Sequence, residues 1–205
     1  MSTNQVSTPQ QRQEWRTQHL QSKNHKFISE MPKIELHVHI EGTMSPSLRW
    51  KLASRNGIPL TAGSKKRPLT SLHEVGEAYK HIRGRIGAAS ADVDMNFTFF
   101  EAYYGGFELL RTEEDYFDLA VGYFERVGRM NVRYCEVFFD PQGHTRRGIE
   151  MDIIMKGFLR AQKYAESHLN VSFQMRRRGF VLIFEFRSSQ SGSCVSSVIC
   201  HQNRQ

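Results

Sequence analysis

Apolar and polar side chains alternate without exception from Ile34 to Ile40, and this period of two predicts a β-strand. Residues 132–139 are apolar almost throughout and predict a second strand, and residues 171–175 begin a third. Between the strands, apolar residues recur at helical spacing over residues 47–55, 99–110 and 150–168. Another helix is predicted to open at Thr112, which begins a capping box. The order of strand, helices, strand, helix and strand favours a parallel sheet with helical crossovers.

The segments outside this periodic region have a different character. Residues 1–30 are polar and aperiodic, and we expect a flexible head with one helical turn around Trp15. Residues 59–68 are predicted to form a polar loop between helices. Residues 176–205 combine three successive arginines, a short apolar run and a Ser-rich stretch, which predicts an atypical basic tail. The boundaries of the folded region are therefore placed at residues 31 and 175.

Composition narrows the class of protein. The chain has 205 residues, of which 39% are hydrophobic and 24% charged, as in one ordinary globular domain. Its formal net charge of +7 lies mostly at the two ends, because residues 31–175 carry 19 basic and 18 acidic side chains. We therefore expect neither a nucleic-acid nor a membrane partner. Three cysteines without a C-x-x-C pair, and no signal-peptide pattern, favour a reducing, intracellular setting.

Two histidines on the first predicted strand are the strongest chemical signal. Alternation places His37 and His39 on one face together with Glu35 and Glu41. If the strand is buried on both sides, these polar groups need partners, and a divalent metal bound by two neutral imidazoles would provide one. Zinc suits imidazole best, with iron, nickel or cobalt as alternatives. The alternative to a metal site is a half-exposed strand whose histidines simply meet water.

Three separated motifs resemble the adenosine and adenine deaminase family. Residues 31–43 (MPKIELHVHIEGT) are similar to the first strand of these zinc hydrolases, which are TIM barrels. Residues 103–106 (YYGG) and 109–116 (LLRTEEDY) resemble the helical stretch before the second strand. Residues 138–149 (FFDPQGHTRRGI) resemble the segment after that strand in the adenine-type branch. The resemblance implies that residues 31–175 form about the first three βα units of an incomplete (β/α)8 barrel.

The resemblance also assigns candidate site residues. His37 and His39 match two zinc ligands of the family. Glu41 stands where adenosine-specific members usually carry Asp, and its longer side chain would occupy space that a ribose needs. Asp140, Gln142 and His144 follow the second strand, where barrel enzymes assemble their sites, and are candidates for substrate binding. The alternative for this segment is a tight turn after Pro141 that Asp140 caps.

The implied reaction is hydrolytic removal of the purine 6-amino group. Zinc activates a water that attacks C6, a glutamate protonates the ring nitrogen, and ammonia leaves. The resemblance implies that the other functional residues come from later strands: a third His with this glutamate three residues after it, another His, and a tandem Asp pair. One Asp of the pair binds zinc and the next contacts the substrate. The 205 residues contain no H-x-x-E and no Asp-Asp sequence, so no general acid is assigned and the zinc coordination is incomplete in this chain.

Taken together, these observations predict a zinc-dependent adenine deaminase of purine salvage, located in the cytoplasm or also in the nucleus. The alternatives are an adenosine deaminase and a catalytically inactive, truncated member of the family. The expected partner is a small-molecule purine, and the sequence carries no indication of oligomeric state. We expect the tail after residue 175 not to be family sequence, since its composition changes abruptly there. The alternatives are a divergent strand pair with a basic start and a basic, hydrophobic membrane or nuclear-import tail.

Overall fold

The main sheet of the protein has three parallel strands. A computed structural model of the chain describes residues 8–22, 24–84, 97–177, 182–183 and 199–200. Its main sheet consists of β1 (Lys33–His39), β4 (Val132–Phe139) and β5 (Ser172–Arg177). The order is β1-β4-β5 and both pairings are parallel, so β4 is the central strand and β1 lies at an edge of the described sheet. The prediction of an α/β fold with a parallel sheet is confirmed.

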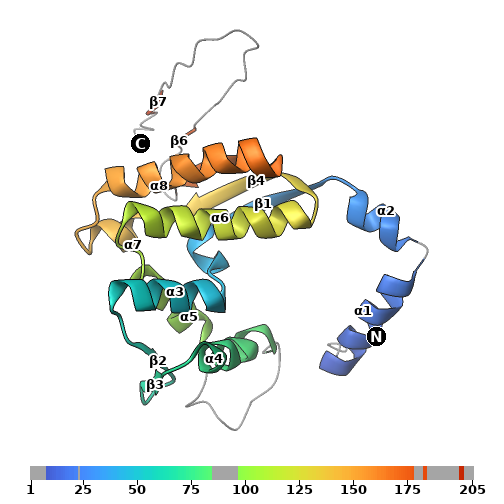
Figure 1. The fold of residues 1–205 in the computed structure, drawn as a ribbon, viewed down its shortest axis with the longest axis horizontal. Coiled ribbons are helices and arrows are strands. Elements are labelled where there is room, and N and C mark those ends of the chain that lie inside the picture. Colours follow the sequence, from blue (N-terminus) through green and yellow to red (C-terminus); the bar gives the residue numbers. More distant parts are fainter. Residues whose placement is uncertain (1–7, 23, 85–96, 178–181, 184–198, 201–205) are drawn as a thin grey trace, which may run out of the picture.

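Two long helices cover one face of this sheet. Helix α6 (Glu113–Arg129) precedes β4, and α8 (Met151–Tyr164) connects β4 with β5 through a π-helical turn, η3 (Ala165–Leu169). Figure 1 shows α6 and α8 side by side across the strands. Thr112 caps α6 through the expected capping box with Asp115. The core lies between sheet and helices, where the largest fully buried side chains include Tyr116, Tyr123, Phe124, Phe139 and Phe158.

The two helices approach each other closely at Gly157. A Cβ atom at this position would lie 2.5 Å from the backbone oxygen of Glu113 and 2.6 Å from Cβ of Tyr116. Real Cβ atoms keep larger separations, so only glycine permits this crossing. The close contact brings the aromatic side chains of both helices into one layer against the sheet.

A second group of helices lies beyond the carboxyl end of β1. It begins with a 3-10 turn and contains three helices and a small hairpin (Figure 1). The bounds are η1 (Ile40–Thr43), α3 (Pro46–Asn56), β2 (Leu60–Ala62), β3 (Arg67–Leu69), α4 (Leu72–Gly84) and α5 (Phe99–Phe107). Ser45 caps α3 by accepting a hydrogen bond from the Leu48 amide, and Gly57 ends the helix at φ +63°.

The prediction of a loop over residues 59–68 needs correction. Most of this segment is the antiparallel hairpin β2–β3, in which Leu60 pairs with Leu69 and Ala62 with Arg67. Leu60, Ala62 and Leu69 are buried, so the hairpin contributes apolar side chains to the core. The sequence pattern does not indicate this contribution, because turn residues outnumber the three buried apolar residues. Helix α4 was not predicted at all.

Arg49 of α3 fixes the position of α5. Its side chain is 3% exposed, and Nη1 donates hydrogen bonds to the Ala102 carbonyl (2.7 Å) and to the Tyr79 hydroxyl (3.1 Å). A Cβ at Gly105 would lie 2.6 Å from Arg49 Nη2, so glycine makes room for the guanidinium. The Gly-Gly pair that follows the two tyrosines therefore has a packing role, and it orients the aromatic residues of α5.

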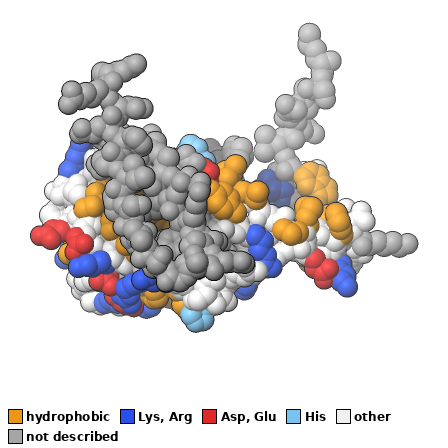
Figure 2. Space-filling model, turned by 90° about the horizontal axis from the view of Figure 1, so that it is seen from above, with side chains coloured by type: hydrophobic (Ala, Val, Ile, Leu, Met, Phe, Trp, Pro, Cys, Tyr) orange, Lys and Arg blue, Asp and Glu red, His pale blue; other side chains and the backbone are white. Residues whose placement is uncertain are grey.

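The head is more helical than predicted. Helices α1 (Pro9–Gln21) and α2 (His25–Glu30) replace the single turn expected around Trp15. Thr8 and Gln11 form a capping box that starts α1, and this local signal accounts for the longer helix. Large apolar side chains of the head remain exposed, and Figure 2 shows apolar groups gathered at the end of the molecule that carries these helices. They are Trp15, Leu20, Phe27, Ile28 and Met31.

Only two short pairs of residues are described beyond residue 177. They are β6 (Leu182–Ile183) and β7 (Ile199–Cys200), which pair antiparallel. The rest of the predicted basic tail lies outside the described residues. Within the described part of the chain, no helix is long and apolar enough to cross a membrane.

Candidate functional site

A bulge in β1 decides which side chains face the candidate site. The pairing of β1 with β4 shifts register between Glu35 and Val38, and His37 has φ +63°. Glu35 therefore pairs with Cys135 on the helix-covered side of the sheet, where its Oε2 accepts a hydrogen bond from the Tyr123 hydroxyl (2.7 Å). The expectation that Glu35 shares a face with the two histidines is wrong, because the bulge interrupts the alternation.

His37 and His39 lie together on the opposite face. Their ring centroids are 5.6 Å apart, and both rings contact Phe138 of β4, at 4.6 and 5.8 Å. His37 is exposed and His39 is half-buried. The predicted proximity of the two imidazoles is therefore present in the fold. In the described residues, no group of three or more His, Cys, Asp or Glu side chains is placed to hold a metal ion.

A hydrogen-bonded chain connects His39 to the end of β4. The Tyr103 hydroxyl donates to Asp140 Oδ2 (3.0 Å) and lies 3.3 Å from His39 Nδ1. Burial, together with the nearby carboxylates of Glu41 and Asp140, raises the pKa of Tyr103 far above its ordinary value, so the phenol stays protonated. Asp140 is the N-cap residue of α7 (Pro141–Thr145), but its side chain makes no capping hydrogen bond. Its carboxylate is turned toward Tyr103 instead of capping the turn.

Glu41 and His144 form a buried pair behind this chain. Glu41 is 1% and His144 0% exposed, and His144 Nε2 lies 3.1 Å from Glu41 Oε1. The same Oε1 accepts a hydrogen bond from the Asp140 amide (2.8 Å). Glu41 Oε2 is buried and has no hydrogen-bond partner among the described residues. The pair thus joins the turn after β1 to the turn after β4.

Three further groups surround the His144 ring. Its Nδ1 lies 2.9 Å from the Tyr116 hydroxyl and 3.2 Å from Arg147 Nη2. Burial raises the pKa of Tyr116, which therefore remains a hydrogen-bond donor. Phe107 of α5 stacks on the imidazole at 4.7 Å. A Cβ at Gly143 would overlap the Phe107 ring, so glycine in the motif permits this stacking.

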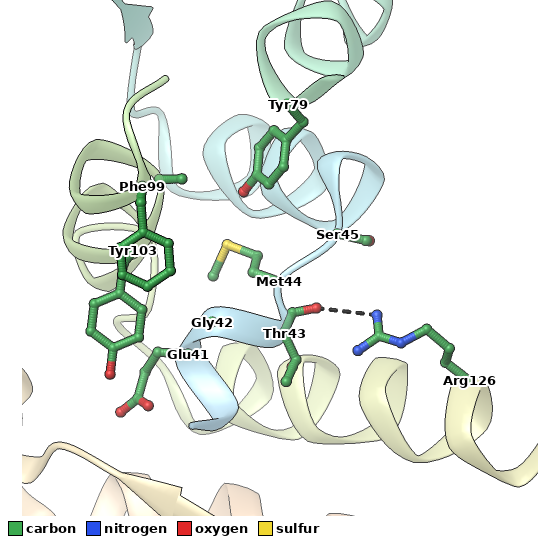
Figure 3. A pocket seen from close by; sticks show the side chains of 10 residues that line it. Glu41, Gly42, Thr43, Met44, Ser45, Tyr79, Phe99, Tyr103 and Arg126 are labelled. Atoms are coloured by element: carbon green, nitrogen blue, oxygen red, sulfur yellow. Dashed lines mark hydrogen bonds between the residues drawn. The ribbon is translucent and has the colours of Figure 1, made fainter. Parts of the chain in front are cut away.

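A cavity of about 310 Å³ adjoins these residues. It lies between η1, α4 and α5, and Figure 3 shows the Tyr103 hydroxyl and the Glu41 carboxylate close together at its edge. On the other side, Arg126 Nη1 donates to the Thr43 carbonyl (3.2 Å). The lining residues are Glu41, Gly42, Thr43, Met44, Ser45, Tyr79, Phe99, Ala102, Tyr103 and Arg126. The cavity combines aromatic walls with a carboxylate and a guanidinium.

The structure brings together most, but not all, of the residues predicted from sequence. His39, Glu41, Asp140 and His144 belong to one network, and His37 lies beside it. The Gln142 side chain is exposed and takes no part in the hydrogen bonds described above. The network also uses Tyr103, Tyr116 and Arg147, which sequence reasoning missed. No local signal distinguishes these tyrosines from the other aromatic residues at helical spacing.

Comparison with known sequences identifies relatives. Residues 32–196 match the family model described as adenosine deaminase, so the match extends beyond residue 175. The chain is 40% identical to the adenine deaminase of Rhodospirillum rubrum over 149 residues, which cover 73% of this chain and 39% of the relative. It is 39% identical to the adenine deaminase of Saccharomyces cerevisiae over 150 residues, with the same coverage of 73% and 39%. The chain thus spans about two fifths of the length of the curated relatives that it matches.

Solved structures show the same arrangement. The adenine deaminase of Arthrobacter aurescens matches with a TM-score of 0.54 and 33% identity, over 70% of this chain and 38% of that one. An amidohydrolase of Burkhoderia ambifaria, solved with bound zinc, matches with a TM-score of 0.56 and 20% identity, over 85% of this chain and 39% of that one. The described sheet and helices therefore correspond to part of a TIM barrel.

Proposed function

The chain belongs to the adenosine deaminase family, and we propose that the protein of which it forms a part is a zinc-dependent adenine deaminase of purine salvage. Water would add its oxygen to C6 of adenine, the bond from C6 to the amino nitrogen would break, and hypoxanthine and ammonia would result. The observation that carries this proposal is the placement of His37 and His39 on one face, next to the network at the ends of β1 and β4. That edge is where barrel enzymes bind their substrates.

The residues present fit a zinc ion as two ligands of a larger set. Both imidazoles lie against Phe138 on the same face, and imidazole nitrogen is a favoured ligand of zinc. A bound zinc ion acts as a Lewis acid that makes water a stronger nucleophile near neutral pH. The zinc bound in the solved structure of the Burkhoderia ambifaria amidohydrolase supports the choice of metal. A complete site would need ligands from later strands, in line with the share of the relatives that this chain spans.

Adenine is favoured over adenosine as the substrate. Relatives at 39–41% identity are named adenine deaminases. Glu41 lines the cavity, and its Oε2 lacks a donor among the described residues, so a ligand N–H group would satisfy it. A free purine base carries a ring N–H that is replaced by the glycosidic bond in a nucleoside. We assign purine contacts to Glu41 and Asp140, whereas the buried His144 reaches the purine only through Glu41.

Loss of the adenine ultraviolet spectrum in the presence of zinc tests the function. The protein should convert adenine faster than adenosine, and His37→Ala should abolish turnover. His73→Ala is the matched control, because His73 is an exposed histidine on α4 whose Nε2 lies 3.6 Å from Glu77 Oε1. Adenine turnover that survives His37→Ala would refute the proposed metal site, and a preference for adenosine would refute the substrate assignment.

The 205-residue chain by itself should show no turnover. Its sequence has no H-x-x-E and no Asp-Asp pair, which carry the proton donor and the last metal ligand in the resemblance described above. The same spectral assay, applied to this chain alone, tests whether the proton donor and the last metal ligand must come from later strands. Measurable deamination by the chain alone would show that its 205 residues supply a proton donor of their own.

A further inference from the structure

We infer that Tyr103 is a positioning residue that fixes the tautomer of His39 and so reserves His39 Nε2 for a metal ion. This inference rests on the proposed function, which assigns His39 as a ligand. The sequence motifs contain no indication of this role, because Tyr103 lies on α5 and His39 on β1, 64 positions apart along the chain.

The assignment follows from counting protons around the phenolic oxygen. Tyr103 has one hydroxyl proton, and Asp140 Oδ2, at 3.0 Å, is a carboxylate oxygen that only accepts. The proton is therefore donated to Asp140. The phenolic oxygen then has only lone pairs for its second neighbour, His39 Nδ1 at 3.3 Å. Nδ1 must carry the imidazole proton, and Nε2 keeps the lone pair that a metal requires.

The buried pair behind Asp140 holds this chain of hydrogen bonds in place. Arg147 can only donate, so its contact with His144 Nδ1 requires that Nδ1 accepts and that Nε2–H donates to Glu41. Glu41 Oε1 in turn accepts the Asp140 amide at 2.8 Å. The turn that carries Asp140 is thereby fixed to the turn that follows His39. This arrangement corresponds to a carboxylate–tyrosine–histidine relay, in which the carboxylate orients the ligand through one intervening hydroxyl.

The packing of Tyr103 can be separated from its hydrogen bonds. Its ring contacts Phe99, Tyr104 and Phe107 within the aromatic cluster of α5. Tyr103→Phe keeps these contacts and removes only the hydroxyl. Tyr104→Phe is the matched control, since Tyr104 lies in the same cluster and is 59% exposed.

The first measurement is the imidazole nitrogen-15 spectrum of the full chain without metal. The His39 resonances, assigned by their loss in His39→Gln, should show a proton on Nδ1 in the wild type and in Tyr104→Phe. In Tyr103→Phe the proton should move to Nε2 in a substantial fraction of molecules. A wild-type His39 protonated on Nε2, or a spectrum unchanged by Tyr103→Phe, would overturn the inference.

The second measurement is the zinc affinity of the whole protein, which supplies the further ligands from later strands, determined by competition with a chromophoric chelator. Tyr103→Phe should weaken zinc binding about 10- to 100-fold, the usual effect of losing such a supporting hydrogen bond, and Tyr104→Phe should leave it unchanged. Equal affinities of wild type and Tyr103→Phe would overturn the positioning role. Failure of the wild type to bind zinc would instead refute the proposed metal site, and the tautomer of His39 would still decide the role of Tyr103.

Discussion

The two faces of the main sheet differ in what they contribute to the protein. On one face, Cys135, Val137 and Phe139 of β4 are at most 1% exposed beneath α6 and α8. On the other, Phe138 lies against His37 and His39, and Glu136, two positions earlier in β4, pairs with Gln174 of β5. Burial on the first face supplies stability, whereas the second keeps polar groups available for chemistry. Substitutions on the two faces should therefore have separable effects on folding and on ligand binding.

The largest expected effect is on the helix-covered face. Phe158 is 2% exposed and packs edge to face against Tyr116 and Phe139. Phe158→Ala should lower the free energy of unfolding by about 3–5 kcal/mol, through lost burial and the cavity left behind. Urea denaturation of the full chain measures this. Leu159→Ala, at a neighbouring residue of the same helix that is 40% exposed, is the control, and an equal loss there would contradict the attribution of the effect to burial.

The next effect concerns the contact between the two covering helices. Gly157→Ala should lower the free energy of unfolding by about 1–3 kcal/mol, because the added methyl meets backbone atoms of α6 that cannot move aside easily. Gly76 in α4 is the matched helical glycine, with nothing within 4 Å of its Cβ position. Gly76→Ala should raise the free energy of unfolding by about 0.5–1 kcal/mol. Effects of the same sign at both positions would contradict the packing argument.

A smaller effect on the free energy of unfolding is expected at the junction of α3 and α6. Burial alone would raise the pKa of Asp115, but hydrogen bonds from Asn56 and from the Thr112 and Arg111 amides, with Arg55, hold this pKa below its ordinary value. The resulting stabilisation is complete above about pH 4, the ordinary value of an aspartate, and is lost as the pH falls through the lower pKa of the folded state.

Asp115→Asn tests this junction. It should lower the free energy of unfolding at pH 7 by about 1 kcal/mol, the difference between charge-assisted and neutral hydrogen bonds. It should also make unfolding less dependent on pH below 4. Urea denaturation at pH values between roughly 2 and 7, the range over which carboxylates titrate, measures both effects. Asp152→Asn, which removes an exposed carboxylate beside Lys156, should change neither.

The smallest effect on stability is expected on the open face. His37 is exposed, so His37→Ala should change the free energy of unfolding by no more than about 0.5 kcal/mol. In the whole protein, where later strands supply the further ligands, the same substitution should abolish zinc binding at the proposed metal site. Paired denaturation and zinc titrations of one sample measure both quantities. A large loss of stability would show that the open face also supports the fold.

The periodicity of the sequence was sufficient to predict the main elements. Strict alternation predicted β1, an apolar run predicted β4, and Thr112 marked the start of α6, since each of these signals depends on neighbouring residues. The hairpin β2–β3 was missed because its apolar residues are few, and their burial depends on contacts with the rest of the core. Helix α4 was missed although Leu72, Val75 and Tyr79 stand at helical spacing. The helical head was underestimated although its capping box is local.

The sequence by itself determined that two imidazoles lie two positions apart on a strand, because strand geometry is a local property. Only the tertiary structure decided that Glu35 turns away at a bulge, that Tyr103 reaches His39, and that Glu41 and His144 are buried together. These contacts join residues 64 to 103 positions apart. Hydrogen bonds over such separations depend on how the helices pack on the sheet, and no local pattern of polar and apolar residues encodes that packing.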